Sequence, residues 1–479
     1  MTDADESLLR ALRTELGHDR VSIEPTRLEQ MGSDTWPLRL VQGVLGRASS
    51  RPLALVRPNC VAELAAALRV LAGRRVAVVP RGGGSGVVGG AAAPSDAVVL
   101  DLAGLDRILA LEEDDLMVRV EAGVGLGRLE AWLGERGYTT GHYPQSIDLA
   151  QVGGLVATRS SGQFSSKYGS IEAIVAGLEV VLASGEIVRM SAVPRRAVGP
   201  DLRQLWIGSE GAFGVISEVT LKIVPRPAER CMQAFALPSF GQGLEGVRQV
   251  MRVGWHPAVV RLYDAVEAAR AFPELVEPGQ AILLLLCEGA PTQASTELAA
   301  IERLLAGLGA RPLGSDPVEA WLTHRNDVTH YERYVQAGTL IDTIEVAASW
   351  RAIARIHDEV CTRVPRQVDE LRMISAHSSH AYPQGTNLYF SFAAQPPRDP
   401  VAAELIHRQV WSAVMDITLR EGGTIAHHHG VGRMRVPWVA ADLGSAHGLL
   451  VALKQALDPS GIMNPGVLLP AGDQRLGGN

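Results

Sequence analysis

The spacing of hydrophobic and polar positions first divides the chain into short β-rich runs separated by helical ones. Between residues 52 and 225, the helical pattern VAELAAALRVLAG is followed closely by the strand patterns RRVAVVP, AVVLDL and LMVRVEAGV. EAIVAGLEVVLASGEIVR predicts a strand and a hairpin, and GVISEVTLKIVPRP predicts a closing strand. This irregular succession predicts an α+β domain with mixed sheets.

A different pattern begins after the Pro-Arg-Pro sequence at 225–227. Long helical patterns, VEAWLTHRNDVTHYERY, SWRAIARIHDEVCTRV and DPVAAELIHRQVWSAVMDITLREGG, alternate with strands such as TNLYFSFAA. The run AILLLLC is too short to cross a membrane and indicates a buried strand. We therefore predict an N-terminal helical segment at 1–50, a first domain at 51–227, a second α+β domain at 228–440 and a C-terminal segment at 441–479.

Composition narrows the class of protein. Of 479 residues, 47% are hydrophobic and 20% are charged, which fits a folded chain with a large core. The net charge of -7 gives no general attraction to nucleic acid or to an anionic membrane. Four dispersed cysteines and an acidic, amphipathic N-terminus argue against a disulfide framework and a signal peptide, so we expect a cytoplasmic protein. We predict no membrane span, although peripheral membrane contact and a homodimer are compatible with the sequence.

A glycine-rich loop, PRGGGSGVVGG at 80–90, follows the strand pattern RRVAVVP. Gly84, Gly86 and Gly89 match the G-x-G-x-x-G dinucleotide fingerprint, but that fingerprint has to open a helix. This loop runs instead into GAAAPSDAVVLDL, which predicts a turn and another strand. Consecutive glycines let backbone N–H groups surround phosphate oxygens; a flexible surface loop is the alternative.

Three further motifs accompany the glycine loop along the chain: TGHYPQSIDLAQVGGLVATRSSGQFSSKYG at 140–169, WIGSEGAFGVISEVTLKIVPRP at 206–227, and the terminal NPG at 464–466. In this order they resemble the flavin-binding domain of the vanillyl-alcohol-oxidase and p-cresol-methylhydroxylase (PCMH) superfamily. The resemblance implies a PCMH-type domain of two α+β subdomains that bind FAD, an α+β cap that covers the substrate, and a C-terminal segment that returns to the FAD domain. Some members of this superfamily attach FAD covalently through a histidine in this loop. The loop here contains no histidine, so we expect FAD to be bound non-covalently; covalent attachment elsewhere in the chain is the alternative.

The same resemblance implies which residues contact FAD. The glycine loop would hold the diphosphate, and the two later stretches would line the rest of the cofactor. By motif position the implied residues are Arg81, Gly82, Gly83, Gly84, Ser85 and Gly86, then Pro144, Ser146, Gly153, Gly154, Thr158, Ser161, Gly162 and Tyr168, and finally Glu210, Gly211, Gly214 and Ile216.

Within this superfamily the second domain is similar to that of the alkyldihydroxyacetonephosphate synthases. The similar motifs are TIAHHHGVGRMR at 424–435, TNLYFSF, HPAVVRLYD and GTLIDTIEVAASW. They imply catalytic roles for Tyr389, Arg261 and the histidines His427, His428 and His429. Related D-2-hydroxy-acid dehydrogenases have glutamate at the place of His428 and a metal-binding histidine at that of Tyr389, while Gln145 departs from the superfamily by replacing an acid.

The residue types agree with these roles. Histidine with a near-neutral pKa suits proton transfer, and an arginine fork suits a phosphate or carboxylate. In an extended run His427 and His429 would share one face and His428 would point away, so we predict no metal site. The alternatives are structural: one buried and two surface histidines, Tyr389 as a core aromatic, and Arg261 in a surface ion pair with Asp264.

The resemblance implies an FAD-dependent transferase that exchanges the acyl group of acyl-dihydroxyacetone phosphate for a fatty alcohol through a flavin N5 adduct, without net oxidation. The alternative is an FAD-dependent D-2-hydroxy-acid dehydrogenase or oxidase, of the lactate or glycolate type, on the same scaffold. A flavin-binding protein that has lost catalysis is the third hypothesis. In each enzymatic case the partner is a small lipid-like or hydroxy-acid substrate, and not a nucleic acid.

Overall fold

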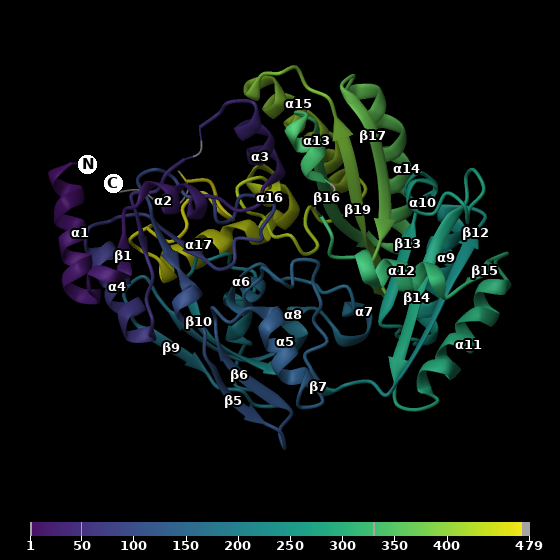
Figure 1. Cartoon of the computed structure of the whole chain (residues 1–479), viewed down its shortest axis with the longest axis horizontal. Helices are drawn as coiled ribbons and strands as arrows, with labels where there is room; N and C mark the ends of the chain where they lie inside the picture. Colours follow the sequence, from purple (N-terminus) through teal and green to yellow (C-terminus); the bar gives the residue numbers. More distant parts are fainter. Residues whose placement is uncertain (1, 49, 329–330, 472–479) are drawn as a thin grey trace.

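The computed structural model describes residues 2–48, 50–328 and 331–471, which form two parts joined along a broad contact (Figure 1). The first part begins with amphipathic helix α1, whose capping box joins Thr2 and Asp5 and whose leucines pack against α4. Its first sheet has the order β1-β2-β4-β3. The elements of this region are α1 (Asp3–Leu16), β1 (Val21–Ser22), α2 (Pro25–Met31), α3 (Pro37–Val44), β2 (Ala54–Val56), α4 (Val61–Gly73), β3 (Val78–Arg81) and β4 (Val98–Asp101).

The glycine loop connects β3 to β4, so it leads into a strand and opens no helix, as the sequence predicted. An antiparallel sheet of order β5-β6-β10-β8-β9 completes the first part. The predicted closing strand, β10, therefore lies at the centre of its sheet, because it inserts between β6 and β8. The elements here are β5 (Ile108–Glu112), β6 (Met117–Glu121), α5 (Leu126–Gly134), β7 (Tyr138–Thr139), α6 (Val152–Ala157), α7 (Ser165–Tyr168), α8 (Ile171–Ile174), β8 (Val175–Val181), β9 (Ile187–Met190), β10 (Val215–Lys222) and β11 (Val224–Pro225).

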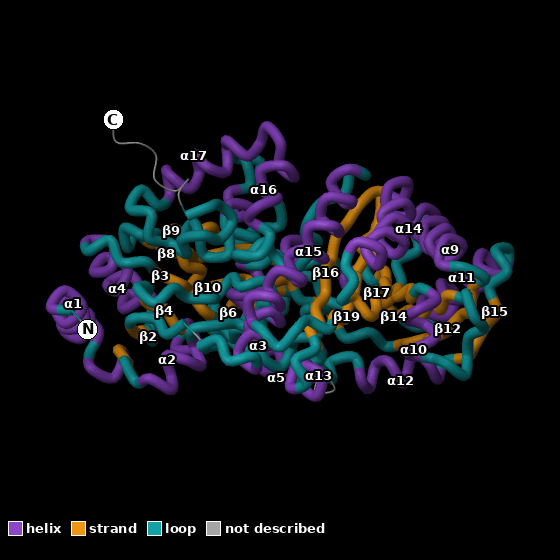
Figure 2. The backbone as a smooth tube through the Cα atoms, turned by 90° about the horizontal axis from the view of Figure 1, so that it is seen from above, coloured by secondary structure: helices purple, strands orange, loops and turns teal. Residues whose placement is uncertain are grey.

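The second part is built on an eight-stranded sheet of order β15-β12-β14-β13-β17-β19-β16, with β18 paired to β19. Figure 2 shows helices on both of its faces. The strands are β12 (Glu229–Leu237), β13 (Val259–Tyr263), β14 (Ala281–Gly289), β15 (Arg311–Gly314), β16 (Leu340–Ser349), β17 (Leu371–Ser378), β18 (Ala381–Tyr382) and β19 (Gly385–Ala394). The helices are α9 (Phe240–Val253), α10 (Ala265–Ala271), α11 (Gln293–Ala306), α12 (Asp316–His324), α13 (Glu332–Gln336), α14 (Trp350–Gln367) and α15 (Pro400–Arg420).

Alternation along the strands decides which face each side chain occupies. In β14, Leu283 and Leu285 pack into the core beneath α9, α11, α14 and α15, whereas Ile282 and Leu284 pack with α12 and with Phe164 of the first part. The run AILLLLC is thus the predicted buried strand, covered on both faces. The two-sided packing and mixed layers confirm the α+β class.

One predicted helix is divided in two. The pattern VEAWLTHRNDVTHYERY forms α12, which ends at His324, and α13, which begins at Glu332. Asn326 and Asp327 follow α12, and side chains of this kind compete with the helix for backbone hydrogen bonds. Residues 329–330 of this pattern lie outside the described residues.

Both ends of the chain cross between the parts. Trp36, Leu38 and Val41, around α3, belong to the core of the second part, and Figure 1 shows α3 beside α13 and α15. The C-terminal stretch, drawn in yellow, returns to the first sheet, where Met463 bridges to Val78. It contains α16 (Val436–Leu443) and α17 (His447–Leu457). By length and composition alone, the helical stretch Val436–Leu457 is apolar enough to cross a membrane, which the sequence analysis did not anticipate.

Candidate active site

A row of polar side chains crosses the second sheet on the face turned toward the first part. Strand register sets Glu345 of β16 opposite Tyr389 of β19, Tyr389 opposite His377 of β17, and His377 opposite Tyr263 of β13. Their neighbours Phe390 and Phe392 are fully buried in the core on the other face. The rings of Tyr389 and His377 stack with centroids 4.8 Å apart.

The three consecutive histidines lie in a bent loop between α15 and α16. Both backbone N–H groups of His427 and His429 donate to the carboxylate of Glu345, which holds the loop in a tight curve. The Nδ1 atoms of His427 and His428 are consequently 2.9 Å apart. The prediction that these two rings point in opposite directions is therefore wrong, because it assumed an extended backbone.

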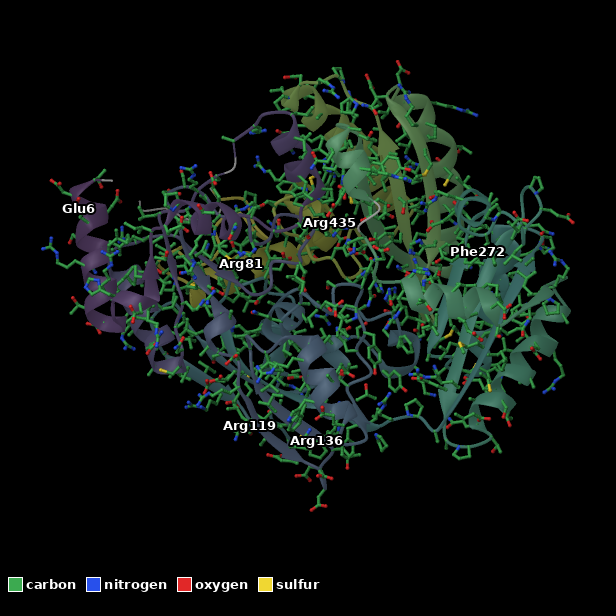
Figure 3. The ribbon with its side chains drawn as sticks, viewed as in Figure 1. Glu6, Arg81, Arg119, Arg136, Phe272 and Arg435 are labelled. Carbon is green, nitrogen blue, oxygen red and sulfur yellow. The ribbon has the colours of Figure 1, made fainter. Side chains whose placement is uncertain are left out.

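Glu345 is itself held by Arg435. Both side chains have no exposed surface, and the Arg435 guanidinium lies 3.1 Å from the Glu345 carboxylate and 5.1 Å from the centre of the Trp411 ring. Arg435 also donates to the Gly430 and Glu345 carbonyl oxygens. Figure 3 labels Arg435 near the middle of the view. The buried ion pair fixes the histidine loop against β16.

Further aromatic side chains join the three histidines. We call the group formed by His377, His380, Tyr382, Tyr389 and the three loop histidines the imidazole cluster. The Tyr382 hydroxyl lies 2.7 Å from Nε2 of His427, and the ring of His380 lies 4.8 Å from that of His428. The ring of His429 meets Tyr389 edge-on at 5.3 Å. Ligand atoms of His380, His427 and His428 all lie within 4.8 Å of one another, a spacing that could hold a metal ion, so the geometric argument against a metal does not stand.

Burial sets the protonation of this cluster. Desolvation lowers the pKa of His427 to about 4 and that of His429 to about 3, where Arg435 adds repulsion. The pKa values of His380 and His428 also fall well below the usual range, first through burial and then through neighbouring histidines. Burial raises the pKa of the Tyr389 hydroxyl. The near-neutral histidine pKa assumed from the sequence is therefore wrong: at pH 7 these rings are neutral and Tyr389 keeps its proton.

Arg261 lies at the end of the same row. Its Nε donates to the Tyr263 hydroxyl at 2.6 Å, and its Nη2 lies 2.9 Å from Nε2 of His377, whose Nδ1 faces Glu267 at 3.1 Å. No carboxylate within the described ranges forms a salt bridge with Arg261. The expected alternative, an ion pair with Asp264, is wrong because Asp264 caps α10 and faces His357.

A second arginine shares this side of the sheet. Arg325, just after α12, lies within 6 Å of the ring centres of Tyr143, Phe164 and Trp321, and Arg261 lies 5.6 Å from the same Trp321 ring. Burial lowers the pKa of Arg325. Two guanidinium groups therefore flank Trp321 at the boundary between the two parts.

The glycine loop fits a cofactor that needs close backbone approach. A Cβ on Gly83 would clash with the Leu149 carbonyl oxygen at 1.8 Å, and Gly84 has a positive φ of 71°. The Arg81 guanidinium lies beneath the loop, donating to the carbonyls of Gly82 and Ser33. The loop is thus pressed against residues 149–151, within the second predicted FAD stretch, and contact of its amides with a diphosphate stays a prediction.

The second stretch is placed around α6 and α7. Pro144 and Ser146 form the turn before α6, Gly153 and Gly154 lie within α6, and Thr158 ends it. Ser161 and Gly162 follow, and Gly162 packs tightly on the Tyr143 backbone. Tyr168 donates to Glu288 of β14, so its hydroxyl joins the two parts. Contact of these residues with FAD remains a prediction.

Glu210 connects the third stretch to the histidine loop. Its carboxylate accepts from the backbone N–H groups of Val431 and Gly432, and burial raises its pKa to about 7. Its carbonyl accepts from Asn464 of the NPG motif. Gly211 and Gly214 take positive φ angles, and Ile216 is buried in β10. The Glu210 carboxylate therefore orders protein backbone.

The sequence analysis missed several site residues. Glu345, His377, His380 and Arg435 were not singled out, although Glu345 and Arg435 lie within motifs that were. Glu345 carries a readable signal, an acid at an interior position of the β-pattern LIDTIEVAAS. His377 and His380 become visible only when β17 and β19 are paired.

Comparisons with known proteins identify relatives of both parts of the chain. Residues 52–191 match the family described as FAD binding domain, and residues 226–468 match FAD linked oxidases, C-terminal domain. An uncharacterized FAD-linked oxidoreductase, YgcU of Escherichia coli K12, is 35% identical over 97% of this chain and 98% of its own. The alkyldihydroxyacetonephosphate synthase of Trypanosoma brucei brucei is 28% identical over 91% of this chain and 76% of its own.

Solved structures show the same fold. An alkyldihydroxyacetonephosphate synthase superposes with a TM-score of 0.80 at 21% identity, covering 96% of this chain and 84% of that one. p-Cresol methylhydroxylase superposes with a TM-score of 0.77 at 16% identity, covering 98% of each chain. These matches confirm the PCMH-type fold, and the matched families confirm FAD as the cofactor. The chain belongs to the family of FAD-linked oxidases.

Proposed function

We propose that this enzyme acts as an alkylglycerone-phosphate synthase, replacing the acyl group of an acyl-dihydroxyacetone phosphate with a fatty alcohol. The observation that carries the proposal is the position of His377, which stacks on Tyr389 and also contacts Arg261. One residue thereby joins a proton donor to an anion-binding arginine. Relatives named as this synthase in three organisms are 26% to 28% identical over 87% or more of this chain.

The charges suit a phosphorylated substrate. Arg261 has no carboxylate partner within the described residues, and Arg325 lies against the same ring, that of Trp321. A phosphate dianion would neutralise the positive charges of both arginines. A cavity of about 380 Å³ adjoins the histidine loop at Ile425 and Ala426, and leucines of the α16–α17 region line it. Its size falls in the range of about 300–1,000 Å³ typical of ligand pockets, and its apolar wall would suit an alkyl chain.

The protonation states fit an exchange of two oxygen substituents. FAD, when bound, would supply the isoalloxazine ring system that reacts with the substrate carbon. Tyr389 keeps its proton and can donate to a departing carboxylate, whereas a neutral His428 or His429 can accept the proton of the incoming alcohol. One carbon–oxygen bond breaks, one forms, a fatty acid leaves, and the flavin is neither oxidised nor reduced overall.

A second function is favoured by a specific feature. The metal-compatible spacing of His380, His427 and His428 would suit oxidation of a D-2-hydroxy acid, in which a cation holds the substrate's hydroxyl and carboxylate. The mitochondrial D-lactate dehydrogenase (cytochrome) of Arabidopsis thaliana is 27% identical over 98% of this chain. Arg261 would then bind the carboxylate.

An anaerobic titration of the flavin-loaded enzyme separates the two. We expect palmitoyl-dihydroxyacetone phosphate plus hexadecanol to give the ether product and palmitate without lasting loss of flavin absorbance. D-Lactate and glycolate should leave the flavin oxidised, with or without added divalent metal. Stoichiometric bleaching by a hydroxy acid, together with no ether product, would overturn the synthase proposal in favour of the dehydrogenase.

A further inference from the structure

A carboxylate, an imidazole and a thiol meet at the end of β13, apart from the imidazole cluster. They belong to Asp264, His357 and Cys361. His357 and Cys361 lie on α14, which packs on the sheet face opposite the row of site residues. From these three side chains we infer a binding site for Zn²⁺ or a similar divalent cation that prefers sulfur and nitrogen ligands.

The spacing matches a zinc coordination sphere. His357 and Cys361 are four residues apart on one helix, so they share a face. Nε2 of His357 lies 3.4 Å from Oδ2 of Asp264, and the three ligand atoms all lie within 4.8 Å of one another. Bonds of about 2.0–2.3 Å in a tetrahedron separate ligand atoms by about 3.3–3.6 Å. Side-chain rotations would bring the three ligand atoms, already within 4.8 Å of one another, into this range.

The neighbouring groups hold the ligands in place. The Asp264 carboxylate accepts hydrogen bonds from the backbone N–H groups of Glu267, at 2.8 Å, and Ala376, at 2.7 Å, and these bonds orient it. The Nδ1 atom of His357 lies 3.1 Å from the carboxylate of Asp358, and the Phe240 ring packs on the imidazole at 4.3 Å. A carboxylate on one imidazole nitrogen fixes the tautomer that leaves the other nitrogen free to bind a metal.

A plain hydrogen-bonded cluster accounts for less of this arrangement. At 3.4 Å the contact between His357 and Asp264 is long for a hydrogen bond that involves charged groups. Two carboxylates also face one imidazole, whose single positive charge can balance only one of them, and a divalent cation would neutralise both. The side chains of Asp264 and His357 are 5% and 14% exposed, and Cys361 is partly buried. A cation can therefore enter, and water can complete the coordination.

The proposed metal site lies between α14 and the first turn of α10. Asp264 caps α10, and Glu267 in the first turn of α10 faces His377 in the imidazole cluster. Figures 1 and 2 both show α9, which carries Phe240, beside α14. A bound cation would tie α14 to the corner between β13 and α10, directly behind the row of active-site residues.

Cobalt binding tests the site, because a cobalt–thiolate bond can come from a cysteine and not from the imidazole cluster. Flavin-loaded protein is treated with a chelator and titrated with Co²⁺, then with Zn²⁺ in competition with a chromogenic chelator. We expect one tetrahedral cobalt spectrum per chain, at wavelengths longer than those of the flavin, and its displacement by Zn²⁺. Cys361→Ser should abolish the thiolate signal, and His357→Gln should weaken Zn²⁺ binding at least tenfold.

Cys231→Ser is the matched control, since Cys231 is another partly buried free cysteine, and it should bind as the wild type does. His428→Ala should leave the thiolate signal intact. If a variant fails to fold, alkylation of wild-type protein decides: Zn²⁺ should protect Cys361 and not Cys231. Absence of binding at micromolar metal, or binding that Cys361→Ser leaves unchanged, would overturn the inference.

Discussion

Single side chains carry the chemistry of the site, and Tyr389 is the sharpest case. Its ring is held by stacking on His377 and by edge contact with His429, so removal of the hydroxyl should leave the ring in place. We expect Tyr389→Phe to lower kcat about 10²–10⁴-fold, the range for loss of a general acid or base, with FAD content unchanged. Steady-state turnover with the substrate identified in the anaerobic titration measures this.

The control for Tyr389→Phe is Tyr334→Phe, which removes the same hydroxyl from a partly exposed residue of α13 and should keep wild-type turnover. His429→Ala should also lower kcat, because its ring contacts that of Tyr389. Wild-type activity in both site variants would exclude proton transfer by this pair.

A buried histidine of the first part makes a prediction about pH. His142 is bonded to Ser160, and burial lowers its pKa to about 4 from an unfolded value near 6.5. Between these values the unfolded chain binds the proton and the folded chain does not, so stability is present above pH 6.5 and is lost as pH falls toward 4. His142→Gln removes this dependence.

The stability difference between wild type and His142→Gln should therefore shift in favour of the variant by about 1.4 kcal/mol for each pH unit below 6.5. Urea unfolding of both proteins from pH 8 to pH 5 measures the shift. Asp34 and Glu210 titrate in the same window with the opposite sign, but they are present in both proteins and cancel in the difference. Parallel curves would show that His142 binds its proton equally in the folded and the unfolded chain.

At the scale of elements, β16 shapes the histidine loop. The side chains of Glu345 and Arg435 have no exposed surface. Glu345→Gln keeps the size of the side chain but leaves the buried Arg435 without a carboxylate partner. Breaking such a pair costs about 3–5 kcal/mol, and the loop amides of His427 and His429 lose part of their acceptor. We expect a lower urea midpoint and loss of turnover together.

The double variant Glu345→Gln/Arg435→Met tests the cause. Removing the second charge should recover part of the stability, because the unpaired guanidinium is the main penalty, while turnover stays low because the loop is still released. Equal stability of the single and double variants would argue that the hydrogen bonds to the loop, and not the charge, dominate.

Particular elements show what the sequence could predict. The glycine loop, Tyr389 and the histidine motif are local patterns, and the sequence analysis singled out each of them. The bend of the histidine loop depends on Glu345, more than 80 positions earlier, and no periodicity within the loop reveals it. The row from Glu345 to Tyr263 likewise depends on the register of four strands. The central place of β10 was not predicted for the same reason, because it depends on pairing with β6 and β8.

At the scale of the whole molecule, segments near the two ends of the chain connect its two parts. Side chains around α3 enter the core of the second part, and the C-terminal segment returns to the first sheet. Asn464 is the centre of that return. Its Nδ2 donates to the carbonyls of Gly90, at the end of the glycine loop, and of Glu210, while its own N–H donates to Val78. The segment therefore joins two predicted FAD stretches.

Asn464 is 1% exposed and has a positive φ of 39°. A glycine at this position would keep the backbone conformation while removing the side chain. Asn464→Gly should therefore lose two hydrogen bonds worth about 1 kcal/mol each. If their role is to order the glycine loop, FAD affinity should fall about tenfold to thirtyfold. Asn464→Ala should lose the same affinity and, in addition, some stability of the apoprotein, because its Cβ disfavours this φ. Fluorescence of FAD released from the two variants measures affinity. A lower melting temperature with unchanged FAD affinity in Asn464→Gly would mean that the C-terminal segment supports the fold without ordering the cofactor loop.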